Sequence, residues 1–341
     1  MNATPWGLPA DDLRTSAEVS GGDLEALRGA RVLVTGGTGF LGSWLVASLL
    51  EANEMLGLRL RLVLVSRHPS AVPLVEGPSL QVVGGDVRSL RAPGSFEVIL
   101  HGAASSSARY GIGDGEPRAM AATIIEGTRA VLEVGRASRA RMLFLSSGAV
   151  YGPQEAPVDE EVTSGPNPMD PRSVYGQAKR LAETLCASAS SAGEVDVVVA
   201  RLFAFVGPRL PLDAHYAAGN FLGDAVAGRR VRVSGDGRPL RSYLYAGDLP
   251  EWCWALLARG VPGRAYNVGS PAALSISELA HRVAALAPGS LAVEFLGSPE
   301  SGPAPCYVPS TDRVRTELGL QPRTDLDLAL RKSYAWFSSR R

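Results

Sequence analysis

Apolar runs typical of buried β-strands alternate with helix-type patterns along the chain up to Val206. The runs are RVLVTG, RLVLVSR, LQVVGGDV, FEVILHGAA, RMLFLSSGAV and VDVVVARLF, and the helical patterns cover 41–53, 123–137 and 173–189. This alternation predicts right-handed crossovers between parallel strands. Because runs such as VDVVVARLF are apolar on both faces, they suit a sheet buried between two layers of helices. We therefore expect an α/β fold, a doubly wound parallel Rossmann sheet.

A glycine-rich segment, TGGTGFLG, follows the first strand run and opens the first helical pattern. Gly36 permits a tight turn, Gly39 lets the backbone approach a pyrophosphate, and Gly42 lets the helix pack closely on the strand. The helix N-terminus offers free N–H groups and a positive dipole to phosphates. This context predicts a dinucleotide site made by Gly36, Thr38, Gly39, Phe40, Leu41 and Gly42.

The composition of the sequence changes after Val206: Gly, Pro and Arg become frequent, and the apolar runs become shorter. We interpret this region as a smaller, loop-rich C-terminal cap that binds substrate. The predicted division is an N-terminal extension at 1–28 that packs on the outside, a dinucleotide-binding domain at 29–200, and a substrate-binding region at 201–237 and 269–341. Residues of about 238–268 are expected to return to the dinucleotide-binding domain.

Composition argues against several classes of protein. Lys plus Arg and Asp plus Glu are both 34, so no global field attracts nucleic acid or an anionic membrane. No run approaches the roughly 20 apolar residues of a membrane helix, and the N-terminus lacks the pattern of a secretory signal. Three widely spaced cysteines and four histidines indicate neither disulfides nor a metal centre. We expect a cytoplasmic protein without a metal.

The end of the second strand run bears on the choice of coenzyme. An NAD-selective protein usually carries Asp or Glu there, to bind the ribose 2′-hydroxyl. Ser66 and Arg67 occupy this place in VLVSRHP. A guanidinium can pair with a 2′-phosphate, which a carboxylate would repel. We therefore expect NADP with Arg67 as a ligand; the alternative is NAD, with Arg67 pointing into solvent.

Three residues form a candidate catalytic set. SSGAVYG closes the fifth strand run, and YGQAK opens the next helical pattern. The spacing of Tyr175 and Lys179 puts both side chains on one helical face, one turn apart. A phenol with a pKa of about 10 is a poor acid or base at neutral pH unless a cation such as Lys179 stabilises its anion. Ser147, at the strand end, can hydrogen-bond the same reacting oxygen. This set suits proton transfer coupled to hydride transfer.

Together, TGGTGFLG, SSGAVYG and YGQAK resemble the extended short-chain dehydrogenase/reductase family, in its group of nucleotide-sugar epimerases, dehydratases and ketoreductases. The resemblance runs from about residue 31 to about residue 319. It implies a nucleotide-sugar substrate and identifies the catalytic residues as Ser147, Tyr175 and Lys179, the last two also touching the coenzyme. It further implies that Asp86 and Val87 contact adenine and that Ala103 and Ala104 lie beside the adenosine ribose. A turn-forming role for Asp86 is the alternative.

On the substrate side, FAFVGP at 203–208 is similar to the family's segment that leads into the cap. The resemblance implies that Asn220 lies against the substrate diphosphate and that Arg241 binds it, as in the family's RDxxxVxD segment. Ser242 replaces the first Asp of that segment, so the match is imperfect. Ser147 is also a candidate substrate contact. Further candidates in the same region are Arg201, Arg209 and Arg238.

The residues after Ser147 narrow the reaction. Sugar-nucleotide 4,6-dehydratases carry Asp-Glu there, whereas this chain has Gly148 and Ala149, which cannot move a proton. We expect reduction of a 4-keto-(6-deoxy)sugar nucleotide by NADPH, with the proton from Tyr175, as in deoxysugar biosynthesis. Alternatives are a 4-epimerase with tightly bound NAD, a decarboxylase or other oxidoreductase, and a dinucleotide-sensing protein without catalysis. The helices at 123–137 and 173–189 pair across a two-fold axis in relatives, which implies a homodimer. The stripe that includes Cys186 can equally be intramolecular core.

Overall fold

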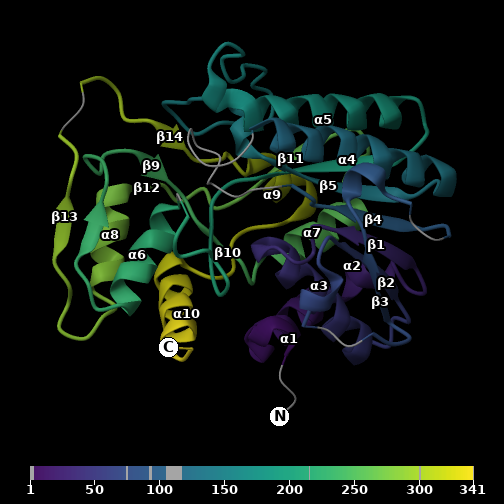
Figure 1. Cartoon of the computed structure of the whole chain (residues 1–341), viewed down its shortest axis with the longest axis horizontal. Helices are drawn as coiled ribbons and strands as arrows, with labels where there is room; N and C mark the ends of the chain where they lie inside the picture. The colour runs from purple at the N-terminus through teal and green to yellow at the C-terminus, as the bar shows by residue number, and fades with distance from the viewer. Residues whose placement is uncertain are drawn as a thin grey trace.

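The computed structural model describes residues 4–73, 76–91, 94–104, 117–214, 216–298 and 301–340. A seven-stranded sheet in the order β11-β6-β5-β4-β1-β2-β3 forms its centre, and all neighbouring strands are parallel. The strands are β1 (Arg31–Thr35), β2 (Arg61–Ser66), β3 (Leu80–Gly84), β4 (Val98–His101), β5 (Arg141–Ser147), β6 (Asp196–Leu202) and β11 (Ala265–Val268). Helices lie on both sides of this sheet (Figure 1). The predicted fold class is confirmed.

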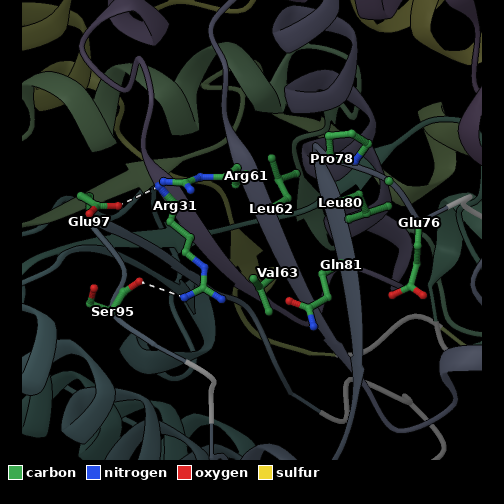
Figure 2. A pocket seen from close by; sticks show the side chains of 11 residues that line it. Arg31, Arg61, Leu62, Val63, Glu76, Pro78, Leu80, Gln81, Ser95 and Glu97 are labelled. Atoms are coloured by element: carbon green, nitrogen blue, oxygen red, sulfur yellow. Dashed lines mark hydrogen bonds between the residues drawn. The ribbon is translucent and has the colours of Figure 1, made fainter.

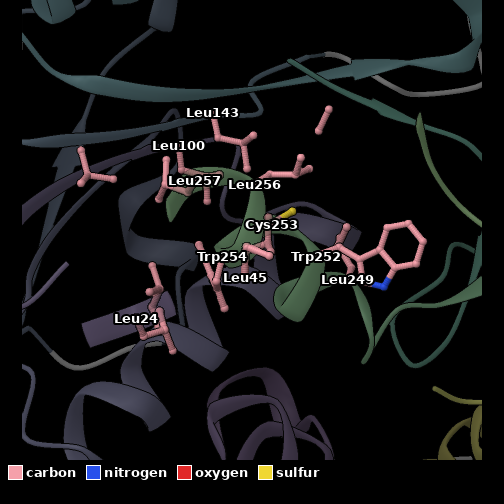
Figure 3. Packing of buried hydrophobic residues seen from close by; sticks show 14 of the residues in the cluster. Leu24, Leu45, Leu100, Leu143, Leu249, Trp252, Cys253, Trp254, Leu256 and Leu257 are labelled. Carbon is pink, nitrogen blue, oxygen red and sulfur yellow. The ribbon is translucent and has the colours of Figure 1, made fainter. Parts of the chain in front are cut away.

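Alternate residues of each strand point to opposite faces of the sheet. In β1, Leu33 packs with α4 (Pro117–Ser138) and α5 (Val174–Ser191), while Val32 and Val34 pack with α3 (Phe40–Met55) and α7 (Leu249–Arg259). Figure 3 shows the second face, where Leu45 of α3 and residues of α7 meet Leu100 and Leu143 of the strands. Both faces are therefore buried, as the doubly apolar runs predict.

The three helices predicted from periodicity are present. The pattern at 41–53 is α3, the pattern at 123–137 lies within α4, and the pattern at 173–189 is α5. The largest difference is at α4, which begins at Pro117. Proline is favoured in the first turn of a helix because its missing N–H has no partner there in any case.

The cap has its own small core and short strands. Its helices are α6 (Ala217–Val226), α8 (Ile276–Ala284) and α10 (Leu326–Ser338), and they surround buried residues such as Phe221 and Leu279. The short strands form three sheets: β12 (Leu274–Ser275), β9 (Leu240–Arg241) and β14 (Cys306–Tyr307); β13 (Val293–Phe295) and β8 (Val231–Val233); β10 (Leu244–Tyr245) and β7 (Phe205–Val206). Helix α9 (Asp312–Leu318) packs near β11. Short 3₁₀ turns are η1 (Pro5–Gly7), η2 (Pro69–Ala71), η3 (Val87–Ser89), η5 (Gly148–Tyr151) and η6 (Pro171–Ser173).

The segment expected to return from the cap divides between the two regions. It supplies α7 and β11 to the large sheet, but its first strand, β9, pairs with β12 and β14 in the cap. The division of the chain into domains stays a prediction.

The N-terminal segment packs against α3 and α7, the helices that cover one face of the sheet, and buried side chains hold it there. It forms α1 (Ala10–Val19) and α2 (Gly21–Glu25), and Leu13 and Leu24 are fully buried. The carboxylate of Asp12 accepts a hydrogen bond of 2.6 Å from the Tyr245 hydroxyl and pairs with Lys332 of α10. The segment therefore ties the two regions together, and its polar composition hid this because Asp12 finds its partners far along the chain.

Two further observations concern the described ranges only. None of the helices there is long and apolar enough to cross a bilayer. Nor do these ranges contain a group of three or more His, Cys, Asp or Glu side chains arranged to hold a metal ion.

Candidate functional site

The glycine loop joins the carboxyl end of β1 to α3. A Cβ at Gly36 would lie 2.4 Å from the backbone of Gly102, and a Cβ at Gly42 would lie 2.1 Å from the carbonyl oxygen of Gly36. Close packing within the protein therefore requires both glycines. A Cβ at Gly39 would meet its nearest protein atom at 3.5 Å, an ordinary contact, and Gly39 is exposed. The open space at Gly39 fits the approach of a phosphate group to the backbone.

This loop lies at the point where the strand order reverses. Strand β1 pairs with β2 on one side and β4 on the other, and open α/β sheets bind ligands at the carboxyl ends beside such a point. Thr35 and His101 end these strands, and their side chains are 2.7 Å apart. The Ala103 N–H donates to the Thr35 hydroxyl over 3.3 Å. Ala103 and Ala104 thus begin the loop beside the glycine segment, and their predicted place beside the adenosine ribose stays a prediction.

A cavity of about 360 Å³ lies at the end of β2. Among the described residues, its lining contains no carboxylate; it consists of Trp6, Thr38, Ser66, Arg67, His68, Val72, Pro73 and Arg209. We call it the β2-end pocket. Arg67 is exposed at its edge. The acid that an NAD-selective site usually places here is absent from this described lining.

Arg209 reaches the β2-end pocket from the segment after β7. Its guanidinium donates to the Thr38 carbonyl over 3.2 Å and lies 5.5 Å from the centroid of the Trp6 ring. Its Nε is buried and has no hydrogen-bond partner among the described residues. Burial lowers the pKa of this guanidinium. The sequence placed Arg209 on the substrate side, whereas the structure places it beside the glycine loop.

The predicted adenine contacts have partners within the chain. The carboxylate of Asp86 accepts from the backbone N–H of Arg88 at 2.9 Å and from its guanidinium at 2.8 Å. The Arg88 side chain lowers the pKa of Asp86. Val87 is buried against Gly127 of α4. Asp86 therefore serves the turn η3, and its predicted contact with adenine stays a prediction.

The three predicted catalytic residues meet at the carboxyl end of β5. Lys179 is only 2% exposed; its Nζ donates to the Leu145 carbonyl over 2.7 Å and lies 4.8 Å from the centroid of the Phe144 ring. Burial lowers the pKa of Lys179 to about 8, opposed by the carboxylate of Glu183. Burial raises the pKa of the Tyr175 phenol, while an interaction with the Ser147 hydroxyl lowers it. Burial is the larger effect, so the Tyr175 phenol keeps its proton at neutral pH, as a proton donor must.

Behind these residues lies an ion pair that sequence reasoning missed. Glu183 accepts hydrogen bonds from Arg201 at 2.7 Å and from the Ser146 hydroxyl at 2.6 Å. Arg201 also donates to the Tyr151 hydroxyl over 2.8 Å. Arg201 is therefore paired inside the protein, and its candidacy as a substrate ligand stays a prediction. The available signal was spacing, because Glu183 follows Lys179 by the interval that separates Lys179 from Tyr175.

The predicted substrate residues lie in the cap. Arg241 of β9 pairs in register with Tyr307 of β14, and its guanidinium lies 5.7 Å from the centroid of the Tyr307 ring. Asn220 is half-buried in α6. Arg238 forms an ion pair with Asp236. Whether Asn220 and Arg241 bind a substrate stays a prediction.

A larger cavity, about 730 Å³, lies elsewhere. Figure 2 shows Arg31, Arg61 and Leu80 along it, and these are the first residues of β1, β2 and β3. It therefore opens at the amino ends of the strands, away from the glycine loop. Ligands of open α/β sheets bind at the carboxyl ends, so this cavity is not the candidate active site.

Comparisons with known proteins agree with this geometry. The sequence model of the NAD dependent epimerase/dehydratase family matches residues 32–269. UDP-glucuronic acid decarboxylase 1 of Arabidopsis thaliana is 31% identical over 316 residues, which cover 91% of this chain and 70% of that protein. UDP-glucose 4-epimerase of Thermotoga maritima has a TM-score of 0.76 at 22% identity, covering 91% of this chain and 99% of that one.

A structure of dTDP-glucose 4,6-dehydratase from Bacillus anthracis, in complex with NAD, has a TM-score of 0.74 at 19% identity and covers 91% and 96% of the two chains. The two structural likenesses establish the fold. The family match spans most of the chain and includes the glycine loop, Ser147, Tyr175 and Lys179. The chain therefore belongs to the NAD dependent epimerase/dehydratase family, and it is an NAD(P)-dependent enzyme of the extended short-chain dehydrogenase/reductase kind.

Proposed function

We propose that this enzyme reduces a 4-keto-(6-deoxy)sugar linked to a nucleoside diphosphate, with NADPH as the source of hydride. The observation that carries the proposal is the β2-end pocket, where Arg67 and Arg209 stand and where the described lining has no carboxylate. A 2′-phosphate is the part of NADPH that such a pocket distinguishes from NADH, because each guanidinium offers aligned, charge-assisted hydrogen bonds.

The proton chemistry follows from the catalytic residues. Lys179, held by the Leu145 carbonyl, places a positive charge one helical turn from Tyr175 and lowers the cost of forming the phenolate. Tyr175 donates its proton to the sugar oxygen as the carbonyl becomes a hydroxyl. Ser147 donates a hydrogen bond to that oxygen while negative charge develops on it. When bound along the glycine loop, the coenzyme supplies the hydride.

The residues after Ser147 support a reaction without dehydration. Gly148 and Ala149 carry no group that transfers protons, so the site supports hydride and proton exchange at one carbon and oxygen. Arg241, at the cap edge, is the proposed ligand of the substrate diphosphate, and Asn220 is proposed to lie against the same group.

Calorimetry of the wild-type protein with NADPH and NADH tests the coenzyme. If two guanidinium contacts to the 2′-phosphate are made, NADPH binds at least about tenfold more tightly than NADH at low ionic strength. Equal affinities, or tighter binding of NADH, would overturn the assignment of the β2-end pocket. Mass spectrometry of coenzyme that co-purifies with the native protein gives an independent answer.

A second candidate is a reaction that oxidises and then re-reduces one sugar with retained NAD. The observation that favours it is the 31% identity to UDP-glucuronic acid decarboxylase 1. A sugar with a carboxylate on C5 becomes a β-keto acid when C4 is oxidised, loses CO₂, and is then reduced again. UDP-glucuronate with NAD tests this reading: release of CO₂ without net coenzyme reduction supports it. An epimerase would instead interconvert the C4 epimers of a UDP-hexose with no gas.

We propose that the enzyme assembles as a homodimer through the outer faces of α4 and α5, which pack against each other at one side of the sheet. The stripe with Cys186 does not serve this interface, because Ala178, Ala182 and Cys186 are buried in the chain's own core. Leu181 of α5 is 45% exposed and lies on the outer face. Light scattering at micromolar concentration tests this, and a monomer mass would contradict it.

A further inference from the structure

Two residues of the β2-end pocket have backbone conformations that side chains rarely adopt. Trp6 has a φ of 54° and Arg209 a φ of 72°, both in the left-handed region. Among the described residues, only five that are not glycine have a positive φ. Two of these five line one pocket and contact each other. Strained backbone persists where the surrounding structure enforces it, and it is frequent at ligand sites.

The backbone beside Trp6 is anchored to the C-terminal end of the chain. The carbonyl oxygen of Gly7 accepts a hydrogen bond of 2.8 Å from the indole N–H of Trp336 in α10. The same oxygen accepts a second hydrogen bond, of 2.7 Å, from the Arg340 guanidinium. Both anchored segments lie outside residues 32–269, the range that the family model matches. This side of the pocket is therefore a feature of the chain beyond the family's shared region.

Arg209 is held from two directions. One of its terminal nitrogens donates to the Thr38 carbonyl over 3.2 Å, and its guanidinium lies over the Trp6 ring. A guanidinium that lies on an aromatic face keeps the N–H groups at its rim for hydrogen bonds. The Nε of Arg209 has no hydrogen-bond partner among the described residues. Arg67 is the second guanidinium of the same lining. The pocket thus offers two cationic donors, one of them pre-oriented.

We infer that Trp6 is a positioning residue for the coenzyme: it holds Arg209 so that the guanidinium hydrogen-bonds to the 2′-phosphate of NADPH. The inference rests on the proposed function, because NADH carries no phosphate at this place. An arginine that is already oriented loses less conformational freedom when it binds an anion than a freely moving one. Trp6 therefore strengthens the binding of NADPH and has little effect on the binding of NADH.

Calorimetry with NADPH and with NADH tests this inference without turnover. Trp6→Leu removes the aromatic face, so the affinity for NADPH should fall about fivefold while the affinity for NADH stays unchanged. Trp6→Phe keeps an aromatic face and should retain most of the preference. Trp6→Met fills more of the space and repeats the measurement if Trp6→Leu folds poorly. Phe295→Leu is the control, since it removes a partly exposed ring on the cap strand β13 and should change neither affinity.

A double-mutant cycle separates positioning from packing. If Trp6 acts through Arg209, adding Trp6→Leu to Arg209→Gln lowers the preference for NADPH no further. A wild-type preference that Trp6→Leu and Trp6→Met leave unchanged, additive losses in the double variant, or equal losses for both coenzymes would overturn this inference and leave the proposed function standing. Equal affinities of the wild type for NADPH and NADH would overturn both.

Discussion

The two ends of the site treat charge in opposite ways. At the catalytic end, each buried ionic group has a partner inside the protein: Lys179 donates to a carbonyl, and Glu183 holds Arg201. At the β2-end pocket, Arg67 is exposed and Arg209 keeps a buried Nε for which the described residues supply no partner. The catalytic end is complete before any ligand arrives, whereas the β2-end pocket has cationic groups available for a ligand.

This difference separates orientation from recognition. Groups that move protons benefit from fixed neighbours, because reorganisation during the reaction would raise the barrier. Groups that determine which coenzyme binds must instead exchange bound water for the ligand. A guanidinium without an ionic partner forms its strongest hydrogen bonds with an anion. Mutations at the catalytic end should therefore change kcat, and those in the β2-end pocket should change coenzyme affinity.

The largest expected effect is at Tyr175. Tyr175→Phe removes the proton donor, so kcat should fall by roughly 10³-fold, within the range typical of general acid–base residues. Coenzyme affinity and the circular dichroism spectrum should stay as in the wild type, because the ring still packs. Near-normal turnover by this variant would show that Tyr175 does not transfer the proton. The account of the catalytic end would then fail.

Gly39→Val tests the glycine loop. The protein itself leaves room for a side chain at this position, so the fold should survive while the phosphate approach is blocked. Calorimetry should detect no coenzyme binding. Gly22→Val in α2 is the control, since a Cβ there meets no atom within 4 Å and the position is far from the glycine loop in sequence. Unchanged coenzyme affinity in Gly39→Val would mean that the loop is only a turn.

Arg67→Ala and Arg209→Gln sharpen the comparison at the β2-end pocket. Each should reduce the preference for NADPH over NADH by roughly 10- to 150-fold, the usual cost of a lost charge-assisted pair of about 1.5 to 3 kcal/mol. Turnover at saturating coenzyme should hardly change. Arg88→Gln serves as control, because Arg88 already pairs with Asp86 and should leave the NADPH/NADH ratio intact. A ratio untouched by both test variants would contradict the role given to the pocket.

The smallest expected effect is on the free energy of unfolding, whose pH dependence should reflect the burial of His101. Burial lowers the pKa of His101 to about 3, whereas the unfolded chain has an ordinary histidine of about 6.5. Between these values the unfolded state binds the extra proton, so the free energy of unfolding decreases as pH falls from about 6.5. The expected slope is about 1 kcal/mol per pH unit. Denaturant titrations at several pH values should show this slope in the wild type and a shallower one in His101→Gln; equal slopes would contradict neutral burial.

Local patterns made the fold and half of the site predictable. TGGTGFLG and YGQAK act through neighbours a few residues apart, so spacing alone locates the loop and the pair of Tyr175 and Lys179. The alternating strand runs likewise predicted a sheet buried on both faces.

The missed features depend on contacts between distant segments. Arg209 contacts the ring of Trp6, which lies far from it in the sequence. Arg201 of β6 pairs with Glu183 of α5, and Tyr307 of β14 packs against Phe203. The burial of Asp12 similarly needs Tyr245 and Lys332. No local spacing encodes these contacts, because tertiary packing decides which polar side chains find partners.

Transfer of deuterium from NADPH labelled at the nicotinamide C4 tests the central claim most directly. The wild-type enzyme is mixed with the labelled coenzyme and a UDP-linked 4-keto-6-deoxyglucose, and the product is examined by mass spectrometry and NMR. The account predicts one deuterium at C4 of the sugar for each NADPH oxidised. Absence of NADPH oxidation with this substrate, together with conversion of UDP-glucuronate or a UDP-hexose by retained NAD, would contradict it.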